Sequence, residues 1–201
     1  MHIFENPYIV IAIFALGVVL LATIGIVFAI KGLKAVKGVE NNYFVSVGKT
    51  ENFFNKLVKE RADKAVLYIS LSADNPRGLY SNPNFLFEIK QILLKYFSDL
   101  ENGRISIYDE KNFISLLNSD TETVLNKVEF CQAELNSCFL KFGALNIVSV
   151  RFGIYFATGA TVTFDEAISR AKQACMLAKN QKKPYAEWNL NSGKAFEKKI
   201  V

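Results

Sequence analysis

The sequence predicts an α/β (α+β) protein in which one transmembrane helix is followed by a mixed β-sheet flanked by helices. Three observations support this prediction. Residues 8–30 are an unbroken apolar run without a charged side chain. Two later runs, Ala65–Leu71 and Leu145–Ala157, have the length and composition of buried strands. Segments with apolar residues at helical spacing surround both runs, which indicates helices packed against one sheet.

The apolar run predicts a membrane anchor. At about 1.5 Å rise per residue, residues 8–30 cover the roughly 30 Å hydrocarbon core of a bilayer, where only a helix satisfies its own backbone. Three lysines follow within residues 31–37, whereas residues 1–7 contain no lysine or arginine. By the positive-inside rule, residues 1–7 lie outside and the later residues are cytoplasmic. We therefore expect a single-pass protein of the inner (cytoplasmic) membrane that contacts lipid through residues 8–30.

The alternative, a cleaved signal peptide, fits this segment less well. A signal peptide needs a basic start, a shorter apolar stretch and a small-residue cleavage site, and the segment has none of these. Gly25 and Ala29 form a small-xxx-small pair that would let two such helices approach closely. A homodimer is left open on that basis.

Composition predicts one globular domain after a lysine-rich connector at residues 31–45. About 165 residues remain, enough for a core of their own, and the chain is 51% hydrophobic and 21% charged.

Three cysteines lack metal-ligand spacing and are expected to be reduced and partly buried (Cys131, Cys138 and Cys175). No metal or cofactor is predicted. The single histidine, His2, excludes a Ser-His-Asp or Cys-His centre in the domain.

The net charge of +5 comes from the connector lysines and a C-terminal group of lysines (Lys182, Lys183, Lys194, Lys198 and Lys199). Attraction to anionic lipid headgroups explains the connector lysines. Nucleic acid is not expected as a partner, because no interleaving of aromatic and basic residues accompanies the charge.

The domain is predicted to alternate helices, strands and one hairpin. The expected elements are a helix over 51–62 capped by Thr50, the strand Ala65–Leu71, a helix Asn84–Leu100, a hairpin of Arg104–Tyr108 and Phe113–Leu117, a helix Thr121–Leu140, the strand Leu145–Ala157, and a helix Asp165–Asn180 capped by Thr163. The hairpin turn is placed at Asp109–Asn112, and its second strand is expected beside both other strands. Tyr185 and Trp188 are expected to pack the last segment onto the domain.

This order resembles the GGDEF domain, the diguanylate cyclase fold of bacterial cyclic di-GMP signalling. YISLSADN is similar to the family's first strand, [FY]-I-D-[IL]-D-x-F-K, and RISIYDEKNFISLL stands where R-Y-G-G-D-E-F-x-[IV]-L-L belongs. VSVRFGIYFA resembles V-[ST]-x-S-x-G-[IV]-A, and AISRAKQACMLAKN resembles the final helix, L-x-x-A-D-x-A-L-Y-x-A-K-x-x-G. The resemblance implies a degenerate GGDEF-like domain at residues 46–185, followed by a tail at 186–201.

The departures from the motifs predict a pseudoenzyme. The resemblance implies metal-binding carboxylates on the first strand and in the hairpin, where two-metal phosphoryl transfer would use them. Ser70 and Ser72 replace the strand acids. Aligned on Phe113, the hairpin signature reads Asp109-Glu110-Lys111-Asn112-Phe113, so a lysine and an asparagine replace the acidic pair. A shifted register would keep Asp109 and Glu110 as acids but would still lack the acid at position 70.

The other sites that the resemblance implies are also altered. The guanine-reading segment is replaced by a shorter loop, ADNPRGLYSNPN, and Leu100 and Gly103 occupy the ends of the inhibitory R-x-x-D site. Lys179 matches the lysine of A-L-Y-x-A-K, and Lys183 stands where an arginine usually helps to hold phosphates. The alternative for both is two solvated lysines that favour the helix dipole.

Two functions are left open. The first is a membrane-anchored, catalytically inactive GGDEF-like module that binds a protein partner, linked to cyclic di-GMP pathways. The second is a structural component of a membrane complex with a ferredoxin-like domain and no nucleotide role. Nucleotide binding is not expected; if it persists, it should be salt-sensitive and run through Lys179 and Lys183. A further domain after Val201 is left open.

Overall fold

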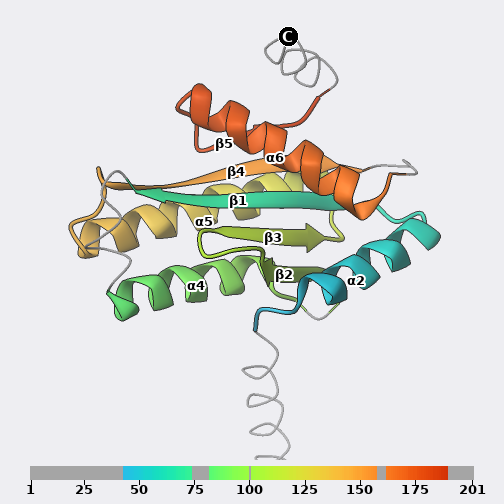
Figure 1. Cartoon of the computed structure of the whole chain (residues 1–201), viewed down its shortest axis with the longest axis horizontal. Helices are drawn as coiled ribbons and strands as arrows, with labels where there is room; N and C mark the ends of the chain where they lie inside the picture. The colour runs from blue at the N-terminus through green and yellow to red at the C-terminus, as the bar shows by residue number, and fades with distance from the viewer. Residues whose placement is uncertain (1–42, 74–81, 100, 158–161, 190–201) are drawn as a thin grey trace, which may run out of the picture. The chain divides into compact units, whose positions relative to one another are not determined.

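The computed structural model describes residues 43–73, 82–99, 101–157 and 162–189. All of them belong to one compact unit, Asn42–Val201. Its elements are α2 (Val47–Lys59), β1 (Ala65–Ala73), α4 (Pro83–Phe97), β2 (Gly103–Ile107), β3 (Asn112–Leu117), α5 (Thr121–Lys141), β4 (Val148–Phe156), α6 (Phe164–Asn180) and β5 (Tyr185–Glu187) (Figure 1).

The strands form one mixed sheet in the order β2-β3-β1-β4-β5. All neighbouring pairs are antiparallel except β4 and β5, which are parallel. The predicted mixed sheet flanked by helices is therefore confirmed, and so is the hairpin strand beside the first strand. The expectation that Phe113–Leu117 also lies beside Leu145–Ala157 is wrong, because β1 lies between β3 and β4.

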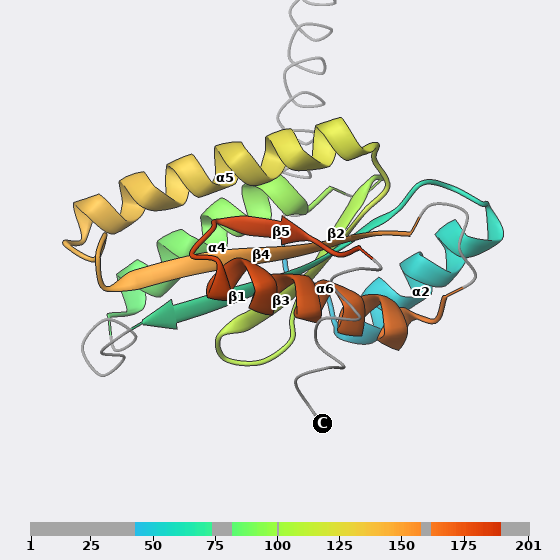
Figure 2. The ribbon, with the colours of Figure 1, turned by 90° about the horizontal axis from the view of Figure 1, so that it is seen from above.

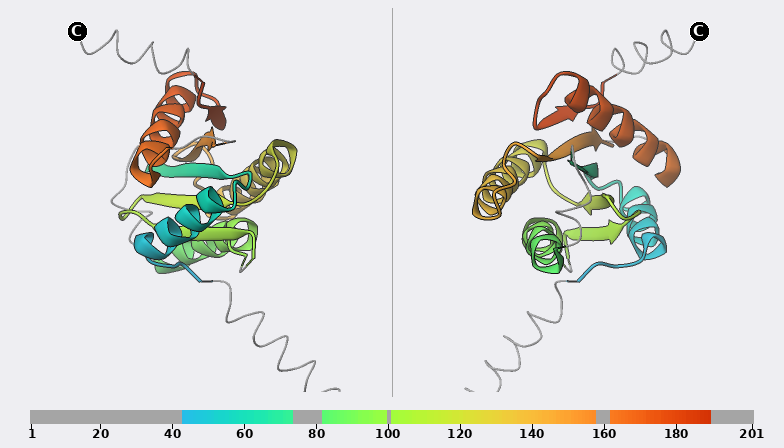
Figure 3. Two further views of the ribbon diagram at one scale, coloured as in Figure 1. Left: turned by 90° about the vertical axis from the view of Figure 1, so that its right-hand side faces the viewer. Right: turned by 60° about the vertical axis from the view of Figure 1, so that its left-hand side comes forward.

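Helices cover both faces of the sheet, α4 and α5 on one and α2 and α6 on the other (Figures 2 and 3). Successive side chains of a strand point to opposite faces, so each strand contributes to two cores. On β1, Leu67 and Ile69 pack into the core under α4 and α5, whereas Val66 and Tyr68 pack into the core under α2 and α6. This burial on both faces explains why β1 reads as a nearly continuous apolar run.

Polar side chains start the helices. Thr163 caps α6 as predicted, because its hydroxyl accepts a hydrogen bond from the backbone N–H of Glu166. The predicted cap at Thr50 is wrong: α2 begins four residues earlier, and its cap is Ser46, which accepts from Lys49 N–H. Thr50 is instead fully buried, and its hydroxyl lies 2.6 Å from that of Ser106 on β2.

Several predicted boundaries differ from the observed ones by one to three residues, among them the first helix, which ends at Lys59 rather than at residue 62, and β1, which continues to Ala73. The helix predicted over Asn84–Leu100 ends at Phe97 instead, since the backbone of Ser98 is already extended. The strand predicted from Leu145 begins at Val148, after a turn in which Ile147 and Val148 donate to the carbonyl of Ala144. The hairpin turn begins one residue earlier than expected, because β2 ends at Ile107 and Asn112 already belongs to β3.

The sheet continues beyond the predicted end of the domain at residue 185. In β5, Tyr185, Ala186 and Glu187 pair with β4, and Trp188 N–H donates to the carbonyl of Ile154. Trp188 packs edge-on against Tyr155, at 5.4 Å between ring centroids. These contacts confirm the expectation that the aromatic residues of this segment pack it onto the domain.

The three cysteines are buried and free, as predicted. The predicted membrane-spanning residues 8–30, with their flanking lysines, lie outside the described residues. Within the described ranges, no helix is long and apolar enough to cross a bilayer.

Candidate functional site

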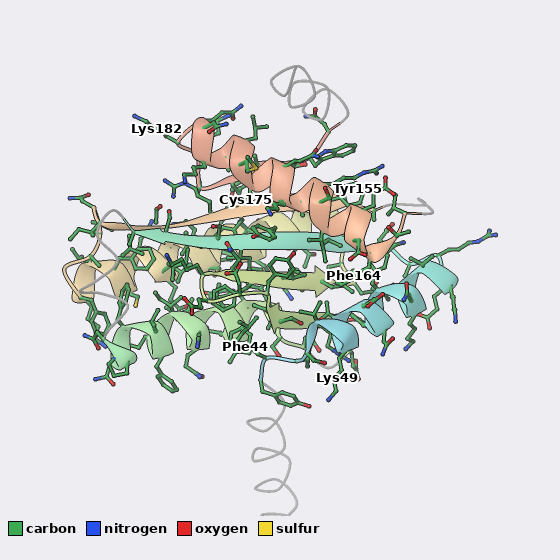
Figure 4. The ribbon with its side chains drawn as sticks, viewed as in Figure 1. Phe44, Lys49, Tyr155, Phe164, Cys175 and Lys182 are labelled. Atoms are coloured by element: carbon green, nitrogen blue, oxygen red, sulfur yellow. The ribbon has the colours of Figure 1, made fainter. Side chains whose placement is uncertain are left out.

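A pocket of about 310 Å³ opens where the end of β1, the β2–β3 turn, β4 and α6 meet. Figure 4 shows Cys175 on the side of α6 that faces the sheet, and Lys182 beyond the end of that helix. The pocket is lined by Tyr68, Ser70, Ser72, Tyr108, Asp109, Asn112, Arg151, Lys172, Cys175, Met176 and Lys179.

The floor of the pocket comes from the sheet. Tyr68, Ser70 and Ser72 alternate along β1, so all three side chains point to the α6 face. Ser70 is the register partner of Asn112 on β3 and of Arg151 on β4. Directly opposite residues have Cβ atoms about 5 Å apart, which brings a hydroxyl, an amide and a guanidinium group into one row.

The β2–β3 turn forms one wall and is held by Asp109. One carboxylate oxygen of Asp109 accepts from the backbone N–H groups of Lys111 and Asn112, both at 2.9 Å. The side-chain amide of Asn112 donates to both carboxylate oxygens, at 2.9 and 2.7 Å. Burial raises the pKa of Asp109, but these hydrogen bonds outweigh it and hold the pKa below the usual value. The Asp109 carboxylate is thus engaged within its own turn.

The opposite wall is α6, which lies very close to β4. Lys172, Cys175, Met176 and Lys179 recur at spacings of three and four residues and therefore share one helix face. The close approach depends on Gly153, where a Cβ would come within 2.0 Å of the Ala171 carbonyl oxygen. The Cys175 thiol lies 3.4 Å from the carbonyl oxygen of Arg151 and donates to it, which ties the helix to the strand at this pocket residue.

Two pocket residues remain protonated near neutral pH. Burial is the main cause that raises the pKa of Tyr68 to about 12, and the negative charge of Asp109 adds to it. Burial likewise raises the pKa of Cys175 to about 11. Tyr68 is therefore a neutral phenol that can donate a hydrogen bond, and Cys175 is a thiol rather than a reactive thiolate.

The charge of the pocket is positive. Three lining residues, Arg151, Lys172 and Lys179, are cationic, against the single carboxylate of Asp109. The described residues contain no ion pair between these three cations and a carboxylate, and no group of His, Cys, Asp and Glu that could hold a metal ion. Hard divalent cations need several oxygen ligands, with carboxylates foremost, so this set of side chains does not fit Mg²⁺.

The structure brings together only part of the residues predicted from the sequence. Asp109, Asn112 and Lys179 line the pocket, as do Ser70 and Ser72, whereas Glu110 and Lys111 are exposed. Phe113 is buried in the core on the other face of the sheet, where it packs against Phe44 at 5.5 Å. Lys183 follows the end of α6, is exposed and does not line the pocket.

Sequence reasoning missed Arg151 and Lys172. A signal for Arg151 was present: it is the one charged residue of β4 and stands at the serine of the V-[ST]-x-S-x-G motif. Nothing local distinguishes Lys172 from other helix lysines. The loop at 74–81 and Leu100 lie outside the described residues.

Comparison with protein-family models and with curated proteins finds no match. Solved structures do match. The GGDEF domain of PA1120 (YfiN or TpbB) from Pseudomonas aeruginosa is 16% identical with a TM-score of 0.60, over 74% of this chain and 99% of that one. The GGDEF domain of DgcB from Caulobacter crescentus, solved with c-di-GMP, is 10% identical with a TM-score of 0.56, over 70% and 85%.

A third match is the diguanylate cyclase SiaD from Pseudomonas aeruginosa, solved with its activator SiaC. It is 10% identical with a TM-score of 0.57, over 83% of this chain and 69% of that one. At such identities the likeness concerns the fold. The described domain has the fold of GGDEF domains, as the sequence motifs implied.

Proposed function

We propose that this chain, which has the GGDEF fold, is a membrane-anchored and catalytically inactive module that acts by binding a protein partner in bacterial cyclic di-GMP signalling. The protein would be held in the membrane by residues 8–30, with the folded domain on the cytoplasmic side. Its function would come from a rigid surface at the membrane rather than from turnover.

The observation that carries the proposed inactivity is the pairing of Ser70 with Asn112 across β1 and β3. In the family motifs that the sequence resembles, the corresponding strand and hairpin carry metal-binding carboxylates. A hydroxyl and an amide are poor substitutes for them, because charge on the ligands sets much of the affinity for a hard cation. Asp109, the remaining acid of the pocket, already accepts four hydrogen bonds from Lys111 and Asn112.

The role as a binding module is supported by the domain that remains. Two separate cores, one on each face of the sheet, give the domain a rigid framework without a ligand. Among the similar structures, SiaD is bound to an activator protein, so this fold supports protein contacts. A partner protein is therefore the first candidate for what this chain binds.

The test of inactivity is a turnover assay. Purified protein incubated with GTP and either Mg²⁺ or Mn²⁺ should form no cyclic di-GMP above a blank without enzyme, while an active cyclase in the same buffer forms it. The triple variant Ser70→Asp, Lys111→Asp, Asn112→Glu should also be inactive, because the glycines of the turn and the guanine-reading loop are missing too. Product formed by the unmodified chain would refute the proposal.

The partner is tested by capture from the native membrane. Tagged protein extracted in mild detergent should retain a defined protein partner, and a diguanylate cyclase or phosphodiesterase among the captured proteins would support the signalling role. Recovery of an assembly complex with no such enzyme would instead favour the second candidate, a structural membrane component.

A further inference from the structure

We propose that the pocket between β1, β4 and α6 binds the phosphate group of a small ligand without a metal ion, and that Arg151 supplies the charge a divalent cation would otherwise provide. This inference concerns a ligand site and stands independently of the proposed protein-binding role. It rests on the position of Arg151, on the two lysines of α6 and on the size of the pocket.

Arg151 is placed directly opposite Ser70. The register partner of Ser70 on β4 is Arg151, so loss of the strand acid is accompanied by a guanidinium group at the adjacent cross-strand position. The exchange inverts the local charge: an acid that would attract a cation is absent, and a cation that attracts an anion is present. Because a guanidinium group is planar and always charged, it suits two-point recognition of phosphate oxygens.

The guanidinium group of Arg151 has hydrogen-bonding capacity left over. It donates one bond, from Nη1 to the carbonyl of Val150 at 3.1 Å, out of the five N–H groups that arginine carries. The backbone of Arg151 is fixed by β1 on one side and by the Cys175 thiol on the other. The side chain therefore leaves from a rigid position, which lowers the entropy lost when it binds a ligand.

Lys172 and Lys179 flank the site from α6. They are two helical turns apart on the same face, with Cys175 between them. The Nζ atom of Lys172 lies 6.0 Å from the ring centroid of Tyr68, above the floor of the pocket. The two ammonium groups and the guanidinium group thus surround a common space from two elements.

Neutral donors complete the set. Ser70 and the protonated phenol of Tyr68 can donate to phosphate oxygens. Asp109 faces the same pocket with its oxygens engaged by the turn, and its negative charge offsets part of the positive charge of Lys172, so Arg151 and Lys179 are the main attraction for an anion. A volume of about 310 Å³ is near the lower end for ligand pockets, which fits a phosphorylated compound of modest size.

The test is isothermal titration of the full-length chain, in non-ionic detergent at low salt with EDTA present, using inorganic pyrophosphate as the probe. We expect saturable binding that weakens about tenfold or more in Arg151→Gln and in Lys179→Ala, because each loses a charge-assisted hydrogen bond. Lys183→Ala is the matched control, since this lysine is on the same segment but outside the pocket; its affinity should stay within about twofold.

The effect of Mg²⁺ on pyrophosphate affinity distinguishes a metal-free site from a site that needs a metal. Mg²⁺ complexes pyrophosphate in solution, so adding it in a parallel titration without EDTA should weaken binding to a metal-free site but strengthen binding to a site that needs the metal. Ser70→Asp gives a second test: the new carboxylate opposite Arg151 should abolish pyrophosphate binding while thermal unfolding shows a folded protein. A phosphorylated metabolite that competes with pyrophosphate would identify an organic source of the phosphate group.

Three results would overturn the proposal. The first is the absence of binding at millimolar pyrophosphate. The second is binding that is strengthened by Mg²⁺. The third is an equal loss of affinity in Lys179→Ala and Lys183→Ala, with none in Arg151→Gln, which would indicate surface electrostatics outside the pocket.

Discussion

Gly153 of β4 lies directly beneath the carbonyl oxygen of Ala171 on α6, so close that a Cβ at Gly153 would approach that oxygen to 2.0 Å. The same Cβ would come within 2.2 Å of the backbone nitrogen of Cys175. Both obstacles are backbone atoms, which cannot rotate away. The position of α6, and with it one wall of the pocket, therefore depends on this glycine.

Gly153→Ala should destabilise the domain by about 3 kcal/mol, because α6 must move away from the sheet. The measurement is urea denaturation followed by circular dichroism. The matched control is Gly48→Ala in α2, where a Cβ meets nothing within 4 Å. That change should stabilise by up to about 1 kcal/mol, since alanine is the better helix former. Equal effects of the two substitutions would contradict the close packing of α6.

We predict that substitutions at Thr50 and Ser106 have coupled effects on the free energy of unfolding. Their hydroxyl groups lie 2.6 Å apart with both residues fully buried, and they join α2 to β2. Thr50→Val alone, or Ser106→Ala alone, should cost about 1–2 kcal/mol because one hydroxyl is left unpaired. The double variant should cost less than the sum of the two, by about 1 kcal/mol. Additive effects in this double-mutant cycle would contradict the hydrogen bond.

This pair also illustrates what the sequence could and could not predict. Apolar spacing predicted the helix around Phe54 and Leu57, and both are buried on its inner face. It did not place the start of the helix, because Ser46 and Thr50 are both of residue types favoured at helix N-caps. Only the contact with Ser106, 56 positions further along the chain, shows that Thr50 faces the core.

The same reasoning applies to the sheet and the pocket. β1 and β3 were predictable because most of their residues are apolar, whereas β5 has three residues and no periodicity of its own. Its pairing depends on the edge that β4 offers. Lys179 was found through its motif, but Arg151 became a pocket residue only once the register placed it opposite Ser70.

We predict that the contribution of Asp109 to stability depends on pH. Its pKa is lowered in the folded state by hydrogen bonds within the turn, so its contribution is present above the unfolded value of about 3.9 and is lost as pH falls through the lower folded value. Asp109→Ala should destabilise by about 1 kcal/mol at pH 6, and the difference from the unmodified protein should shrink below about pH 4.

The control for this pH effect is Glu110→Ala on the same turn, an exposed carboxylate. Removing it should change stability by no more than about 0.5 kcal/mol at any pH. Denaturant unfolding across the pH range measures both variants. An Asp109→Ala effect that persists unchanged at the lowest pH would contradict the assignment of the stabilising role to the carboxylate.

The membrane topology stays a prediction, and it can be tested by protease access. Protease added to intact cells should leave the folded domain uncut, because the three lysines after the apolar run favour a cytoplasmic domain. After permeabilisation, the loop segments should become sensitive. Digestion of the domain from outside intact cells would contradict the predicted orientation, and recovery of the protein in the soluble fraction would contradict the anchor.

The contacts of Trp188 lead us to predict that the segment after α6 stabilises the domain. Its ring packs edge-on against Tyr155, the guanidinium carbon of Arg170 lies 4.6 Å from its centroid, and its indole N–H donates to Gln173 at 3.1 Å. Trp188→Ala should therefore cost about 2 kcal/mol, because aromatic contact and cation–π attraction are lost together. Trp188→Phe keeps the ring contacts but loses the hydrogen bond, so its cost should be nearer 1 kcal/mol. Urea denaturation followed by circular dichroism measures both variants, since each lacks the only tryptophan of the chain. An unchanged midpoint for Trp188→Ala would show that β5 and the residue after it do not hold to the sheet in solution.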